Sequence, residues 1–151
     1  MSTKANKELI HEYYEAWEVG DSERLASLFS DDFTKVHHDA QGEQVIVSNA
    51  PDENELSLTE WFTGFVENFP DKTIEIHDMV AEGTVVMTRI TATLRLAGEF
   101  MGLEPTGEYF DLHEFQSFKI QDGKIVEFHS VGDILDAFDQ LGADVEIKQE
   151  G

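Results

Sequence analysis

The stretch Pro105–Leu141, PTGEYFDLHEFQSFKIQDGKIVEFHSVGDILDAFDQL, decides the fold. A Pro-Thr-Gly turn leads into a strand-like segment from Glu108 to Ile120. Asp122-Gly123 is a dipeptide typical of a hairpin turn, so we expect a second, antiparallel strand from Lys124. That strand ends at a lone carboxylate, Asp133, just before a short helical segment. Two such strands can deliver one acid to the rim of a cavity.

The sequence before this stretch predicts helices first and strands afterwards. Three segments have apolar residues at helical spacing or helix-capping residues: 5–19, a shorter segment from Asp21, and 57–69. Three further segments predict strands: 33–38, 72–80 and 84–96. Residues 39–56 are polar and predicted to be mostly irregular, interrupted only by Val45-Ile46-Val47, which is typical of a lid or binding loop. The order predicts an α+β fold, with three N-terminal helices packed on a strongly bent antiparallel sheet.

Length and composition limit the class of protein. A chain of 151 residues fits one domain over residues 1–151, with a core from about 5 to 143. There is no cysteine, so neither disulfides nor a thiolate nucleophile can form. No run approaches the roughly 20 apolar residues of a membrane helix, and Met1–Lys7 lacks an apolar signal core. We therefore expect a cytoplasmic protein without a membrane partner.

The charge balance is extreme. Thirty-two acids against ten bases give a formal net charge of -22. Such a surface repels phosphate backbones, so nucleic acid is a poor partner. The acids are spread along a chain with clear apolar periodicity, which argues against a disordered tail. We interpret the composition as that of a halophilic protein.

Several short motifs in a fixed order carry a family resemblance that extends from Tyr13 to Gly142. They are Trp17 with Gly20-Asp21, Asp31-Asp32-Phe33, Phe69-Pro70-Asp71, Ala81-Glu82-Gly83, Gly98–Gly102, Pro105-Thr106-Gly107, Asp122–Glu127, Asp133 and Gln140-Leu141-Gly142. In this order the chain resembles the SnoaL-like polyketide cyclases of the nuclear transport factor two-like superfamily. The resemblance implies a cone-shaped barrel, a homodimer formed through the sheet, and chemistry without metal or cofactor.

The resemblance also implies a role for Asp133. In the cyclases, the aspartate at this position acts as general acid/base: it removes an α-proton from an ester, and the enolate closes a ring by aldol addition. A carboxylate in an apolar pocket is poorly solvated and so a stronger base. The alternative is that Asp133 only caps the helix that follows it.

Two departures from the family pattern point to a different substrate. Phe128-His129 stands where the family usually has His-Trp on the last strand. The segment Arg95–Ala97 replaces a histidine common in the family. We expect the ligand to be a small apolar carbonyl compound.

Strand alternation suggests the other site residues. Glu114 and Gln116 share a strand face with Phe118, as polar groups among apolar ones, which is typical of a ligand pocket. We expect Gln116 and His129 to act with Asp133, although His129 could instead lie at the dimer face. The residues that we expect to bind substrate are Glu114, His38, Trp17, Trp61, Phe62 and Phe118.

On the opposite face of the same strand, Asp111 and His113 could pair with Arg89 and Arg95 of the neighbouring strand. A metal site is disfavoured, because adjacent histidines such as His37 and His38 point to opposite faces of a strand. Three hypotheses stay open at this point: a cyclase-like or isomerase-like enzyme, a non-catalytic ligand-binding protein, and a structural dimer with an unused cavity.

The net charge predicts a strong effect of salt on stability. Repulsion among the surface acids should be screened at molar salt, where the Debye length shrinks to about 3 Å. We expect a markedly higher melting temperature in molar KCl than in dilute buffer, measured by thermal denaturation. Equal melting temperatures would contradict the halophilic interpretation.

Overall fold

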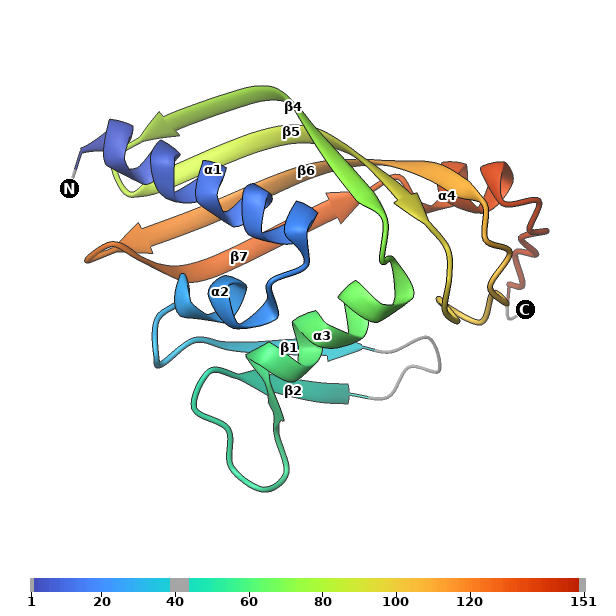
Figure 1. Cartoon of the computed structure of the whole chain (residues 1–151), viewed down its shortest axis with the longest axis horizontal. Coiled ribbons are helices and arrows are strands. Elements are labelled where there is room, and N and C mark those ends of the chain that lie inside the picture. Colours follow the sequence, from blue (N-terminus) through green and yellow to red (C-terminus); the bar gives the residue numbers. More distant parts are fainter. Residues whose placement is uncertain (1, 39–43, 150–151) are drawn as a thin grey trace.

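The computed structural model describes residues 2–38 and 44–149. Its elements follow in this order: α1 (Thr3–Val19), α2 (Ser22–Ser27), β1 (Thr34–His38), β2 (Gln44–Ser48), β3 (Leu56–Ser57), α3 (Leu58–Asn68), β4 (Lys72–Glu82), β5 (Val85–Arg95), β6 (Tyr109–Gln121), β7 (Lys124–Gly132) and α4 (Ile134–Gln140). The predicted α+β class is confirmed, with four helices against a curved antiparallel sheet (Figure 1).

The main sheet has the strand order β4-β5-β6-β7, and every neighbouring pair is antiparallel. Register shifts between Ile76 and Asp78 and between Lys119 and Ile120 mark bulges, which increase the local twist of a sheet. Helix α1 crosses the inner, concave face of this sheet, and α4 packs beside β6 (Figure 1). The inner face is therefore the one that can enclose a site.

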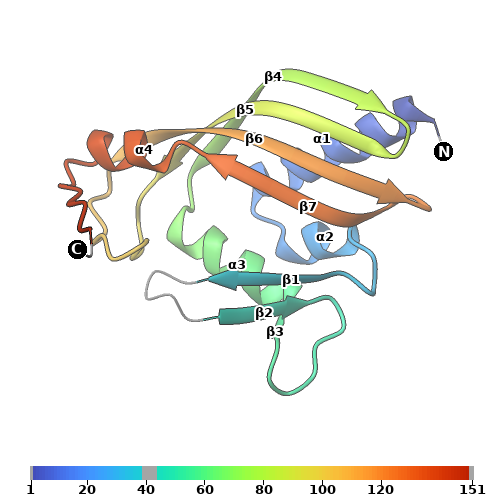
Figure 2. The same cartoon turned by 180° about the vertical axis from the view of Figure 1, so that it is seen from behind.

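A smaller sheet closes the other side of the molecule. β1 pairs antiparallel with β2, and β2 pairs parallel with the short β3. Helix α3 packs against α2 and β2. Strand β1 lies opposite the edge strand β7 of the main sheet (Figure 2). The predicted interruption at Val45-Ile46-Val47 lies within β2, where residues 44–48 pair with all of β1.

The helices begin and end where their capping residues predict. Ser57 and Glu60 form the predicted capping box at the start of α3. Gly20 ends α1 in the left-handed conformation, with φ of 73°, where a residue without a Cβ is favoured. None of the helices in the described residues is long and apolar enough to cross a membrane.

Aromatic rings fill the interior between the two sheets. Tyr13 makes edge-to-face contacts with Tyr14, Phe29 and Phe118, with centroids 5.2 to 6.0 Å apart. Such pairs contribute about 0.5–1.5 kcal/mol each beyond the area that they bury. The interior is therefore rigid and apolar, and any polar group within it needs a partner.

The outer face of the main sheet differs from the prediction in its ion pairs. Asp111 and His113 do not pair with arginines: their hydroxyl partners are Thr93 and Thr91, directly opposite them on β5. Arg89 instead pairs with Asp78, at 2.8 Å, and Arg95 with Asp71, at 2.6 Å. The register explains this, because Arg89 and Arg95 stand opposite Phe115 and Tyr109 on β6.

Candidate functional site

A chain of hydrogen bonds links α1 to the inner face of the main sheet. The Tyr14 hydroxyl donates to Oε1 of Gln116 at 2.7 Å and lies 2.6 Å from the Thr88 hydroxyl. All three residues are buried. Because Tyr14 has one proton to give, the Thr88 hydroxyl donates to the Tyr14 oxygen. Burial raises the pKa of the Tyr14 phenol, so Tyr14 stays neutral and keeps this proton.

The chain continues to a carboxylate on the same strand. Gln116 donates from Nε2 to Oε2 of Glu114 at 2.6 Å, and the same nitrogen lies 3.5 Å from the Ser130 hydroxyl. Glu114 and Gln116 are two residues apart on β6, so both face inward. The predicted polar pair within an apolar strand face is therefore present, and it is connected to the helix as well.

Glu114 is held in a setting that favours its neutral form. Burial raises the pKa of the Glu114 carboxyl above its ordinary value, against the opposing effects of hydrogen bonds from Gln116 and Ser130 and of the Lys35 charge. Gly132 stands opposite Glu114 on β7. A Cβ at Gly132 would lie 3.2 Å from the Glu114 Cγ, so the absence of a side chain at Gly132 makes room for this carboxylate.

A lysine lies at the other side of this interior. The Lys35 ammonium of β1 is 4.8 Å from the ring centroid of Phe128 and 5.2 Å from that of Trp61. Burial lowers the pKa of Lys35, and the negative charge of Glu114 opposes this shift. Lys35 makes no ion pair within the described residues. The interior thus holds an amine and a carboxyl whose pKa values are shifted by burial toward each other.

A groove of about 400 Å³ runs between the edges of the two sheets and opens onto Lys35. Its walls come from the start of β1 and from β7: Phe33, Thr34, Lys35, Val126, Glu127, Phe128 and His129. Figure 2 shows these two strands facing each other. A small molecule could reach the Lys35 amine by this route.

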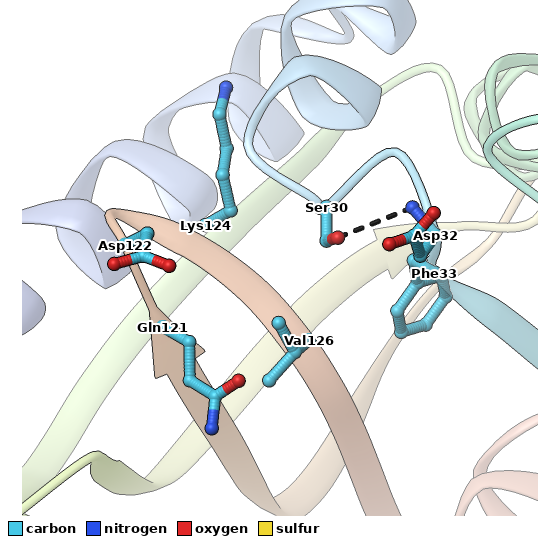
Figure 3. Close-up of a pocket in the computed structure, with 7 residues that line it drawn as sticks. All are labelled: Ser30, Asp32, Phe33, Gln121, Asp122, Lys124 and Val126. Carbon is cyan, nitrogen blue, oxygen red and sulfur yellow. Dashed lines mark hydrogen bonds between the residues drawn. The ribbon is translucent and has the colours of Figure 1, made fainter.

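A second hollow, of about 320 Å³, lies beside the β6–β7 hairpin (Figure 3). Asp32 and Asp122 border it, and Lys124 points away from both carboxylates toward α2, where its Nζ donates to the Ser27 carbonyl at 2.6 Å. The Asp32 amide donates to the Ser30 hydroxyl at 3.2 Å. These groups serve local turns and do not converge, so the interior with Glu114 and Lys35 is the better candidate site.

Comparison with known proteins identifies the family. The model of the SnoaL-like polyketide cyclases matches residues 7–141, which is most of the chain. The chain belongs to the SnoaL-like polyketide cyclase family. The predicted resemblance is confirmed. Among curated proteins, none matches the sequence significantly.

Solved structures agree with this SnoaL-like assignment. AclR, a candidate hydroxylase from Streptomyces galilaeus, is 28% identical with a TM-score of 0.74, over 98% of this chain and 91% of AclR. IdmH, a candidate polyketide cyclase from Streptomyces antibioticus, is 29% identical with a TM-score of 0.66, over 91% of this chain and 98% of IdmH. An LEH-like epoxide hydrolase from M. tuberculosis, 15% identical with a TM-score of 0.65 over 92% of this chain and 90% of that one, shares the fold alone.

In this SnoaL-like protein, Asp133 and His129 lie outside the hydrogen-bonded chain of Tyr14, Gln116 and Glu114. Asp133 is exposed and caps α4, where its side chain accepts from the Asp136 amide at 3.2 Å. His129 is also exposed, at a strand position that alternates with the inward Phe128, and it borders the groove. The capping role weighed for Asp133 is therefore present.

The predicted aromatic residues fall into two groups. Phe62 and Phe118 are almost fully buried in the core, while Trp17 and Trp61 are partly buried at its edge. Trp61 is the one whose ring contacts Lys35. The side chain of His38 lies outside the described residues.

Sequence reasoning did not assign site roles to Tyr14, Thr88, Ser130 or Lys35. Tyr14 and Thr88 looked like ordinary helix and strand residues, and their meeting depends on how α1 crosses the sheet. Strand alternation could have pointed to Lys35, because it lies on the same strand face as the buried Phe33, while the exposed Thr34 lies on the other face.

Replacing Glu114 with Gln should make stability less dependent on pH. Because the pKa of Glu114 is raised above its ordinary value of 4.5, the folded protein binds more protons than the unfolded chain between these two values. The free energy of unfolding of the native protein therefore falls as pH rises through this window and the Glu114 carboxyl ionises. Glu114→Gln lacks that loss, so its free energy of unfolding relative to the native protein should increase as pH rises above the ordinary pKa of 4.5.

Urea denaturation at a series of pH values measures this difference. Glu82→Gln is the matched control, since it removes the same charge from an exposed position at the end of β4. If the two variants have the same pH dependence, Glu114 is not in the setting described.

Proposed function

We propose that this SnoaL-like protein is an acid/base enzyme that moves a proton at the α-carbon of a small, mostly apolar carbonyl compound, such as a β-keto ester. The observation that carries this proposal is the half-buried carboxyl of Glu114 in its hydrogen-bonded chain. A carboxyl with a raised pKa is a stronger base when ionised, and it can return the proton near neutral pH. A ring closure of the aldol type is the reaction that the family resemblance suggests.

The roles of the polar residues follow from their contacts. Glu114 acts as the base, and Gln116 holds its carboxylate through the 2.6 Å hydrogen bond. Tyr14 fixes the Gln116 amide, so that its nitrogen points toward Glu114. Asp133, the base suggested by the family resemblance, is the competing candidate in the same proposal. Its exposure and its hydrogen bond to the α4 backbone favour Glu114 over Asp133.

Deuterium uptake into a panel of carbon acids, followed by NMR, tests this proposal without knowledge of the natural substrate. A positioned general base contributes about 10²- to 10⁴-fold, so Glu114→Gln should lose about that much of the exchange rate. Asp133→Asn is the matched control: it removes a carboxylate, and the Asn can still cap α4. We expect this variant to keep the exchange rate of the native protein.

Two other results would change the conclusion. Loss of exchange in Asp133→Asn, with Glu114→Gln unaffected, would move the role of base to Asp133. A compound that binds but shows no protein-dependent exchange would favour a non-catalytic ligand-binding protein.

We also propose that two copies pair through the outer face of the main sheet. Four apolar residues on this face are between 52% and 73% exposed: Val80, Met87, Phe115 and Val131. They form two direct cross-strand couples, Val80 with Met87 and Phe115 with Val131. An exposed apolar group of this kind is typical of an interaction surface.

Charge supports a second copy as the partner. The outward strand residues of β4–β7 include three bases (Arg89, Arg95 and Lys119) and five acids (Glu75, Asp78, Glu82, Asp111 and Glu127). The whole chain has ten bases against 32 acids. The outer face is therefore much less acidic than the rest, so two copies can approach there with little repulsion.

Phe115→Asp should dissociate such a dimer. The new carboxylates would be buried opposite an apolar surface in both copies of a symmetric interface. Sedimentation velocity should show a dimer for the native protein and a monomer for the variant. Val19→Asp, which puts the same new carboxylate on an exposed apolar residue at the end of α1, away from this face, is the control. A native protein that sediments as a monomer would contradict the proposal.

A further inference from the structure

Lys35 has no task in the proton transfer proposed above, yet its setting is unusual for this chain. The protein has seven lysines and a net charge of -22. No lysine forms an ion pair within the described residues, so Lys35 differs from the others in its surroundings and not in lacking a carboxylate partner. Its nitrogen lies instead between the rings of Phe128 and Trp61, at 4.8 and 5.2 Å from their centroids.

Two effects of this setting oppose each other. Aromatic faces attract a cation, which favours the ammonium. Burial removes water from the same group, which favours the neutral amine. Burial is the largest influence, and it lowers the pKa of Lys35. A lysine desolvated among apolar groups is a usual way to obtain a nucleophilic amine near neutral pH.

The groove gives this amine access to a ligand. Lys35 lines the groove between β1 and β7, and so does Phe128. Lys72 is the informative comparison, because burial lowers its pKa as well. The Lys72 nitrogen donates to the Phe69 carbonyl at 3.0 Å, and Lys72 lines neither of the two hollows described above. Lys35 therefore combines an amine whose pKa is lowered by burial with an open approach from the groove.

We propose that Lys35 is a nucleophile that forms an imine with an aldehyde or ketone bound in the groove between β1 and β7. The neutral amine attacks the carbonyl carbon, a C–N bond forms, and the oxygen takes up a proton to give a carbinolamine. The hydroxyl then takes up a second proton from solvent and leaves as water, so that the C–O bond breaks and an iminium ion remains. Hydrolysis by the reverse steps restores the free amine.

The position of Glu114 suggests a further reaction of this imine, which is removal of its α-proton. The Glu114 charge acts on the Lys35 nitrogen from the inner face of the sheet. A carboxylate there could remove the α-proton of the iminium ion, and the electron pair would pass to nitrogen as an enamine. An iminium ion holds its α-proton less firmly than the parent ketone, so the amine would assist the base. This second role depends on the proposed function, whereas imine formation itself does not.

Reductive trapping tests the inference on the full-length protein. Benzaldehyde is the first probe because it has no α-proton, so its capture is independent of proton transfer at carbon. Sodium cyanoborohydride reduces an iminium ion to a stable secondary amine, which adds the mass of the aldehyde less one oxygen atom. Peptide mapping by mass spectrometry then locates the label among the seven lysines and the α-amino group.

We expect Lys35 to be labelled severalfold faster than the average of the other lysines, since a lowered pKa raises the neutral fraction of the amine. Lys35→Met should lose this label and keep the melting temperature of the native protein. Lys119→Met, on the outer face, should leave the labelling of Lys35 unchanged. Labelling of Lys35 at the rate of the other lysines would overturn the inference.

Ethyl acetoacetate as second probe separates this inference from the proposed function. Trapping at Lys35 without deuterium exchange in the native protein would uphold the nucleophile and reject the proton transfer. Exchange that survives in Lys35→Met at the native rate, together with no trapping at Lys35, would uphold the base and reject the nucleophile.

Discussion

The hydrogen bond from Tyr14 to Gln116 is the contact on which the interior depends. It joins α1 to the middle of β6, across 102 positions of the sequence, at a place where both groups are buried. A buried amide without a partner would cost about 1–3 kcal/mol, so the helix and the sheet are held in one relative position. The same amide then presents its nitrogen to Glu114. The polar groups of the site are thus oriented by the packing of the helix.

The inner face of the main sheet differs from the acidic surface in its ionisable groups. The chain is strongly acidic overall, yet the inner face contains one carboxyl and one amine whose neutral forms are both favoured by burial. Each partly offsets the other, because opposite charges favour ionisation of both groups. Groups perturbed in this manner are typical of functional sites, although structural networks perturb pKa values as well. The groove beside Lys35 gives this pair contact with a ligand.

Membership of the SnoaL-like family and the local geometry bear on different questions. The family match covers residues 7–141 and accounts for the fold. It says less about the base, because Asp133 is exposed and its carboxylate serves the backbone of α4. Phe128, found where the family usually has a histidine, contacts the Lys35 ammonium.

The sequence by itself determined the helices, most of the strands and the β6–β7 hairpin. It also determined that Glu114 and Gln116 lie on the same face of β6. These features depend on local rules: apolar spacing, capping boxes and turn residues act over a few positions. Only the tertiary structure decided which polar groups meet. Tyr14, Thr88 and Lys35 come from three elements, and their distances from Gln116 and Phe128 follow from how α1 and β1 pack against the main sheet. Burial, which sets the pKa directions of Glu114 and Lys35, is likewise a property of that packing and leaves no local pattern in the chain.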